Sequence, residues 1–319
     1  MLDWLAKKLD YFRNVTNLGA GNSPPSNSEQ ASNVAETTEE IGSLKAEEAI
    51  ALWLAGKDAW NEWAKEHEHW SVDFKGIDFK EYLTTQSKVD KEAPLLFEGF
   101  NFPGNVDFSC AIFNGRVNFC NATFNGQTNF YKAKFFDDAE FRNAKFGEGW
   151  DSIIDPAVDF HEAEFLGKAD FEEAVFCAEC EFNDSVDFRN TTFAHDVNFN
   201  KICVLGGFHF SESNLLKNVS FCGASFRWRA NFISTNFTGK ADFSDADFGQ
   251  ASPDFFKAVF NGDACFSNTN FYKGGSFDYA EFKARANLNF KETYLVYDDG
   301  VRESVSFSSA VFKKGEGPF

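Results

Sequence analysis

The chain has 319 residues, and 43% of them are hydrophobic, which is enough for one large domain or two small ones. Its 42 phenylalanines stand against one methionine, and a core of one side-chain type indicates a repeated slot instead of an ordinary mixed interior. The net charge of −19 argues against binding to nucleic acid or anionic membrane and favours a basic partner, with solubility alone as the simpler interpretation.

The N-terminal residues predict a short helix followed by a linker. We expect an amphipathic helix over residues 1–18, whose apolar stripe is Leu2, Leu5, Leu9 and Phe12. Charged residues interrupt the apolar ones, which argues against a signal peptide or a membrane span here. Residues 19–42 are rich in Gly, Ser, Pro and Asn and predict a flexible linker.

Residues 43–70 read as two helical pieces hinged near Gly56. They carry more tryptophans than a free helix pair of this size needs. We therefore expect a helical N-terminal cap that covers apolar surface through Trp53, Trp60 and Trp63.

Residues 71–319 repeat one phenylalanine every five or six positions, as in VNFCNATFNGQTNFYKAKFFDDAEFRNAKF (117–146). A small residue usually stands two positions before each Phe, so both point to one face of an extended segment. A turn after each short segment, four to a circuit, predicts an all-β solenoid of about nine to ten coils at the strand spacing of about 4.8 Å. The expected core includes Phe108, Phe119, Phe130, Phe141, Phe171 and Phe232.

The stretches VDFSCAIFNGRVNF and ANFISTNFTGKADFSDADF resemble pentapeptide repeats in their Phe-centred form. This resemblance covers residues 72–312 and implies a right-handed quadrilateral β-helix. The segment GKDAWNEWAKEH (56–67) is similar to the short helix that precedes the repeats in many members of that family.

The positions between the Phe centres are expected to face solvent. Acidic residues directly before a Phe are interpreted as a solvated face first and a recognition surface second; they are Asp107, Glu140, Asp159, Asp170, Glu181, Asp187, Asp242 and Asp247. The count of centres takes Phe176, Phe182 and Phe188 as consecutive sides. Three excursions interrupt the repeat, at 80–95, 147–157 and 289–304.

No motif for catalysis or cofactor binding is present, and the five histidines do not group at metal-ligand spacing. We therefore expect no enzyme activity, no cofactor and no metal. The seven cysteines show no disulfide framework, which favours reduced thiols and a cytoplasmic location.

The leading functional hypothesis is a non-catalytic protein–protein interaction or scaffold module with a partner of basic surface. It involves no direct nucleic-acid binding and no membrane span. The resemblance implies an alternative, a DNA mimic that binds a type II topoisomerase (gyrase) and protects or inhibits it. A membrane-associated adaptor tethered by the N-terminal helix is a third class, and a homodimer through the under-capped C-terminal end is a further expectation.

The expected partner-binding residues lie in two excursions, because a uniform repeat offers no distinctive spot. The first excursion contributes Trp150, Asp151 and Asp155, and the second contributes Tyr294, Tyr297, Asp298 and Asp299. The alternative is that both segments fold back onto the β-helix.

Overall fold

The computed structural model describes residues 42–85, 94–147, 157–177, 184–249, 252–291 and 304–313. All of these residues belong to one compact unit, Gly42–Phe319. The predicted helix 1–18 and the linker 19–42, apart from Gly42, therefore lie outside the described residues.

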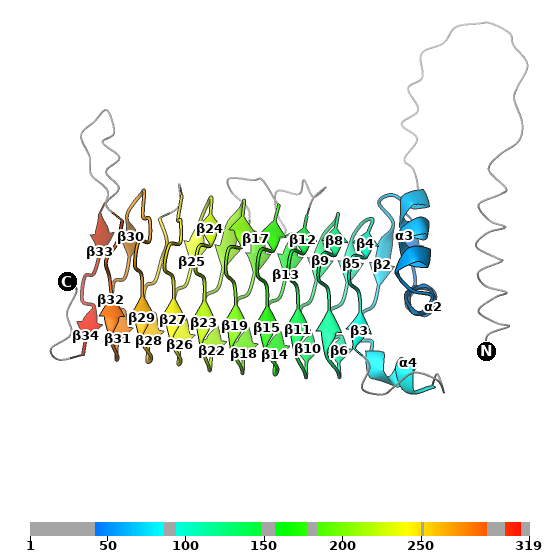
Figure 1. The fold of residues 1–319 in the computed structure, drawn as a ribbon, viewed down its shortest axis with the longest axis horizontal. Coiled ribbons are helices and arrows are strands. Elements are labelled where there is room, and N and C mark those ends of the chain that lie inside the picture. The colour runs from blue at the N-terminus through cyan, green and yellow to red at the C-terminus, as the bar shows by residue number, and fades with distance from the viewer. Residues whose placement is uncertain are drawn as a thin grey trace, which may run out of the picture. The chain divides into compact units, whose positions relative to one another are not determined.

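Short parallel strands form the four sides of a β-helix, which confirms the predicted all-β solenoid. Figure 1 shows the coils following one another from β2 to β34. Side A comprises β1 (Ser43–Leu44), β2 (Ser71–Asp73), β5 (Val106–Asp107), β9 (Thr128–Asn129), β13 (Val158–Asp159), β17 (Asp184–Asp187), β21 (Gly207–His209), β25 (Ala230–Asn231), β30 (Gly275–Ser276) and β33 (Val305–Ser306). Side B comprises β6 (Ile112–Phe113), β10 (Lys134–Phe135), β14 (Glu164–Phe165), β18 (Thr192–Phe193), β22 (Asn214–Leu215), β26 (Asn236–Phe237), β28 (Val259–Phe260), β31 (Glu281–Phe282) and β34 (Val311–Phe312).

The other two sides follow in chain order within each coil. Side C comprises β3 (Leu95–Leu96), β7 (Val117–Asn118), β11 (Ala139–Glu140), β15 (Ala169–Asp170), β19 (Val197–Asn198), β23 (Val219–Ser220), β27 (Ala241–Asp242), β29 (Ala264–Cys265) and β32 (Ala286–Asn287). Side D comprises β4 (Asn101–Phe102), β8 (Thr123–Phe124), β12 (Lys145–Phe146), β16 (Val175–Phe176), β20 (Cys203–Val204) and β24 (Ser225–Phe226), and single bridges at Asp247, Asn270 and Lys291 extend it.

We number the coils by their inward residue on side A. These residues, for coils 1 to 10, are Phe74, Phe108, Phe130, Phe160, Phe188, Phe210, Phe232, Phe255, Phe277 and Phe307. The count agrees with the expected nine to ten coils.

Two kinds of corner explain why the Phe spacing alternates between five and six residues. On sides A and C the Phe follows the strand and opens a four-residue turn, in which the N–H of Ala111 donates to the carbonyl of Phe108 at 3.0 Å. The third turn residue, Cys110, has φ 57°, a conformation that costs about 1–2 kcal/mol for a residue with a side chain. On sides B and D the Phe is the second strand residue, and a longer corner follows.

Side chains directly before the Phe on sides A and C support these turns. Asp107 Oδ1 accepts the N–H of Ser109 at 2.8 Å, and Asp170 Oδ1 accepts the N–H of Glu172 at 3.1 Å. Such Asx turns satisfy a backbone donor that the strands leave unpaired. The expectation that these acidic residues form a solvated face is wrong for Asp187, which is only 3% exposed; Glu181 lies outside the described residues, and the other six are half-buried.

The core consists of stacked phenylalanine columns. The six expected core residues, Phe108, Phe119, Phe130, Phe141, Phe171 and Phe232, are fully buried. The ring of Phe130 lies 4.7 Å from that of Phe160 on the next coil, with parallel planes. Rings of neighbouring columns meet edge to face, as Phe119 and Phe130 do at 5.8 Å and 79°. Both geometries are those that aromatic pairs prefer.

The column pattern is broken where side chains of another size enter. Val204 and Leu215 hold two positions that Phe holds elsewhere. Nearby, Phe208 occupies a slot that carries Val186 and Ala230 on the adjacent coils, and its ring lies 5.1 Å from that of Phe226. The larger residue thus fills volume that the smaller ones leave, as close packing requires.

The count of Phe182 as a centre is wrong. Side D of coil 4 is held by Phe176, and the following side, side A of coil 5, is held by Phe188. No side remains between them for Phe182, which lies outside the described residues.

The N-terminal helices continue the aromatic columns beyond the first coil. Helices α2 (Ala46–Leu54) and α3 (Lys57–Glu66) meet at Gly56, whose φ of 93° suits glycine. Trp53 stacks on Phe97 at 5.3 Å, and Trp60 stacks on Phe74 at 6.0 Å. Trp63 is buried against Trp60. The predicted helical span is wrong in one detail, because β1 pairs with β2 and is not helical.

The same helices satisfy backbone groups at the edge of coil 1. The indole N–H of Trp53 donates to the carbonyl of Leu96 at 3.0 Å, and that of Trp60 donates to Asn101 at 2.8 Å. Asn61 donates to the Gly99 carbonyl at 2.9 Å. An exposed sheet edge is an aggregation hazard, and these contacts cover it. Helix α4 (Phe79–Thr85) starts on side B of coil 1.

Truncation of one stacked ring tests the core. Phe171 is fully buried between Phe141 and Phe199, whose rings lie at 4.7 and 4.9 Å. We expect Phe171→Ala to lower the free energy of unfolding by about 3–5 kcal/mol, measured by chemical denaturation. Phe256→Ala is the control, because Phe256 is half-buried outside the columns and should cost about 1 kcal/mol or less. A melting temperature of Phe171→Ala within a degree or two of the parent would contradict the column architecture.

Deletion tests the role of the tryptophan-bearing helices. Removal of residues 1–70 takes away Trp53 and Trp60 and exposes the rings of Phe74 and Phe97, so we expect aggregation. Removal of residues 1–33 leaves these helices and should give a protein without aggregates in light scattering. A 71–319 fragment that stays free of aggregates would show that the helices are dispensable as a cover.

Candidate functional site

Beyond coil 1, every internal stretch that lies outside the described residues connects the same two sides of the β-helix. We define the D–A corner as the connection from side D of one coil to side A of the next. The described residues on either side of each segment lie on sides D and A in every case. The segments, which lie outside the described residues, are 148–156, 178–183, 250–251 and 292–303.

The predicted partner-binding residues fall in two of these segments. Trp150, Asp151 and Asp155 lie in the first, and Tyr294, Tyr297, Asp298 and Asp299 lie in the last, so all seven are outside the described residues. The described residues on either side of each segment show where that segment joins the β-helix. One segment joins coils 3 and 4 and the other joins coils 9 and 10, so about 30 Å separates them along the D–A corner at the strand spacing.

A third aromatic feature lies between these two attachment points on the same corner. Arg227, Trp228 and Arg229 connect β24 on side D to β25 on side A. Backbone bonds hold them: the Arg227 N–H donates to Val204 at 2.9 Å, and the Arg229 carbonyl accepts from Phe208 at 2.7 Å. Both arginines are exposed, and Trp228 is half-buried.

Within the described ranges, the two arginines differ from most others on the β-helix in having no acidic partner. Arg116 pairs with Glu140, Arg142 with Asp170 at 3.6 Å, and Arg189 with Asp187 at 2.5 Å. Arg227 and Arg229 form no ion pair with any residue of the described ranges. On a chain of net charge −19, two neighbouring unpaired guanidinium groups beside a tryptophan form a distinct spot.

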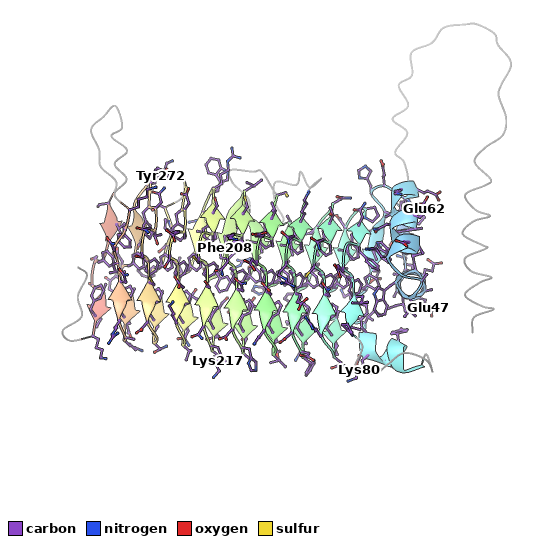
Figure 2. All side chains as sticks on the ribbon, in the orientation of Figure 1. Glu47, Glu62, Lys80, Phe208, Lys217 and Tyr272 are labelled. Atoms are coloured by element: carbon purple, nitrogen blue, oxygen red, sulfur yellow. The ribbon has the colours of Figure 1, made fainter. Side chains whose placement is uncertain are left out.

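The neighbouring coils extend this spot. Because Phe208 pairs with Ala230, Gly206 and Gly207 of the preceding coil lie beside Trp228 and Arg229. Two coils further, Tyr272 is 36% exposed, and Figure 2 shows it on the same edge of the β-helix. Sequence reasoning missed these residues because it searched for aromatics in the excursions alone. The signal was the run SFRWRANF, where Trp and two Arg stand at corner positions of a regular coil.

Side C carries a polar groove. The groove has a volume of about 460 Å³, and its walls include Lys168, Asp170, Asp196, Asn198, Lys240 and Asp242. These groups satisfy one another: Asn198 donates to Asp170 at 3.1 Å, and Lys240 donates to Asp242 at 2.7 Å. Burial opposes ionisation of Asp242, but hydrogen bonds from Lys240 and Ser244 lower its pKa. The polar side chains that line this groove are thus held in place by hydrogen bonds to one another.

One compact cluster of ionisable groups lies at the corner between sides A and B. The carboxylate of Glu162 forms an ion pair with Lys132 at 3.3 Å and lies 3.2 Å from the ring nitrogen Nε2 of His161. It also accepts a hydrogen bond from the hydroxyl of Tyr131 at 3.4 Å. Although burial opposes it, the contact with Lys132 lowers the pKa of Glu162. These contacts bridge coils 3 and 4. Across the described ranges, no three His, Cys, Asp or Glu side chains are grouped to hold a metal ion.

Comparison with known proteins found no match: no family model, no curated protein and no solved structure matches this chain. Within the described residues, no helix has the length and hydropathy needed to span a membrane.

The groove residue Asp170 yields a pH-dependent prediction. Burial raises the pKa of Asp170, against the opposing effects of the Glu172 N–H and Arg142, so its ionised form destabilises the fold above that pKa. Asn at this position keeps the acceptor for Glu172 and removes the charge; Asn198 holds the equivalent place one coil later.

We therefore expect Asp170→Asn to raise the melting temperature at pH 7. The difference from the parent should shrink as the pH falls toward the ordinary aspartate value of about 4, because both proteins then carry a neutral group. Thermal scans between about pH 3 and 7 measure it, and a difference that grows on acidification would contradict the assignment.

Proposed function

We propose that this chain is a non-catalytic protein–protein interaction or scaffold module and that its partner contacts the D–A corner. The observation that supports the proposal most is that all connections outside the described residues beyond coil 1 run from side D to side A, as does the connection Arg227–Trp228–Arg229 between them. Tryptophan, tyrosine and arginine are the residue types that dominate binding energy at protein interfaces.

The β-helix suits this role because it holds distant groups at fixed separations. Its backbone is hydrogen-bonded from coil to coil, so groups on the corner need little ordering when a partner binds. The acidic residues of segments 148–156 and 292–303 favour basic groups on the partner, whereas Arg227 and Arg229 favour a carboxylate between them. A partner surface with this alternation of charge would be selected over a uniformly basic one.

The proposal includes membership of the pentapeptide-repeat family, supported by the four-sided β-helix and the Phe-centred units. It also includes a cytoplasmic location, supported by free thiols at the six described cysteines.

A second candidate function is mimicry of DNA toward a type II topoisomerase. It is favoured by the net charge of −19 and by outward aspartates that recur on side A, namely Asp73, Asp107, Asp159, Asp187 and Asp254. Against it, asparagine, histidine and serine interrupt this row, and Arg189 neutralises Asp187. We rank it below the scaffold function.

Capture from native cell extract tests the scaffold function. Trp228→Ala, Trp150→Ala and the pair Tyr294→Ala with Tyr297→Ala should each reduce capture of the same proteins about tenfold, because they remove aromatic anchors. Quantitative mass spectrometry provides the measurement, and melting temperatures should change by no more than about 1–2 °C. Tyr279→Ala is the matched control, since Tyr279 is 54% exposed but follows side A on a different corner. Equal loss with the control variant would refute the D–A corner as the contact.

Inhibition of topoisomerase-catalysed supercoiling separates the two candidates. The scaffold function predicts no effect at micromolar protein. Mimicry predicts inhibition that added salt relieves, because both the contact and the long-range attraction are electrostatic. A clear salt-sensitive inhibition would reverse our ranking.

A further inference from the structure

The opposite corner of the β-helix carries a column of apolar side chains that is exposed at its two ends and half-buried between them. We define the B–C corner as the connection from side B to side C within a coil. Its first residue is apolar on four consecutive coils, 3 to 6, and polar on coils 2 and 7, where it is Asn114 and Thr238. The four apolar residues, here called the corner column, are Phe136, Leu166, Ala194 and Leu216.

Backbone bonds align the corner column. The N–H of Leu166 donates to the carbonyl of Phe135 at 2.8 Å, and that of Leu216 donates to Phe193 at 2.9 Å, so each member lies one coil from the next. At the strand spacing the column is about 14 Å long. Phe136 is 48% exposed and Leu216 is 43% exposed. Single exposed apolar residues are common, but four in register form a continuous apolar ridge.

Charged residues follow the ridge on its side C flank at two successive corner positions. From coil 3 to coil 6, the first of these positions carries Asp137, Gly167, His195 and Lys217, and the second carries Asp138, Lys168, Asp196 and Asn218. Asp137, Lys168, Asp196 and Lys217 are exposed and Asp138 is half-buried; Figure 2 shows Lys217 on the lower edge of the β-helix. Neither lysine forms an ion pair with a residue of the described ranges.

When the exposed charges Asp137, Lys168, Asp196 and Lys217 are taken in the opposite direction, from coil 6 to coil 3, each sign is opposite to that in the forward direction. If a second copy is placed antiparallel on the ridge, coil 3 faces coil 6 and coil 4 faces coil 5. Asp137 then faces Lys217 of the second copy, and Lys168 faces Asp196, each pair occurring twice by symmetry. The apolar residues meet across the same axis, Phe136 against Leu216 and Leu166 against Ala194.

We propose that the corner column is the contact of a two-fold symmetric homodimer in which two copies of this chain pack antiparallel. A parallel arrangement would instead place Asp137 near Lys134, which is already engaged with Glu164 at 3.0 Å. Helix α4 occupies the same corner only at coil 1 and leaves coils 3 to 6 open (Figure 1). The contact is independent of the proposed partner surface, because the D–A corner lies on the other side of each coil.

A contact of four coils is short, so the dimer forms in a concentration-dependent equilibrium and not as an obligate pair. Sedimentation equilibrium of the full chain over a concentration series tests it, with the weight-average mass rising toward twice that of the monomer. Leu216→Glu buries a charge twice across the axis and should weaken association at least about a hundredfold. Val311→Glu is the control, since Val311 is 59% exposed but lies on side B at coil 10, away from the column, and it should associate as the parent does.

Charge reversal tests the antiparallel order separately. Lys168→Glu should weaken association about tenfold, because it sets two carboxylates against each other at two places. Adding Asp196→Lys to the same chain restores the pairs and should restore the parent affinity. Circular dichroism and melting curves verify that each variant is folded. A parent that stays monomeric, a Leu216→Glu variant that associates like the parent, or a double variant that remains as weak as Lys168→Glu would each overturn the proposal.

Discussion

The distance between hydrogen-bonded strands governs this molecule, because stacked aromatic rings require nearly the same distance. One phenylalanine per side per coil places each ring over the last at 4.7 to 5.0 Å along most of the columns, while the backbone pairs strand to strand. Core packing and backbone hydrogen bonding therefore impose one register. A residue gained inside a side shifts the register locally, as it does in β17 between Asp184 and Val186, and the other differences in coil length among the described residues lie at corners.

This concentration of length differences at corners separates structure from recognition. The sides are repetitive, and their outward polar groups form hydrogen bonds in Asx turns or between coils, as Asn198 does with Asp170. The corners carry side chains that the fold itself does not require: Trp228 with its two arginines on one, and Phe136 with Leu216 on the opposite one. Two copies joined through the second corner would present the first corner outward on both faces, which gives a scaffold two equivalent attachment lines.

The fold could be predicted from the sequence because the spacing of the phenylalanines equals the number of residues in each side of a coil. The exposed polar positions were harder to interpret. Asp107 and Asp170 look like solubility charges until the turn after the Phe is known, since the hydrogen bond they accept depends on backbone direction. Phe182 was assigned by spacing alone, which cannot distinguish a side from an insertion of similar length. Trp228 escaped notice because a regular coil was assumed to be uninformative.

A coil is also a unit of length that can be copied. Twenty-two positions separate Phe108 from Phe130, and the same number separates Phe188 from Phe210 and Phe210 from Phe232. If such a block were duplicated or deleted, each remaining strand would still pair with a neighbouring strand in the same register. The stability would then change only through the side chains that differ between the blocks. Duplication or deletion of one coil in the gene would then change the distance between two corner segments by about 4.8 Å. The separation between two groups bound at that corner could therefore change in evolution only by whole coils.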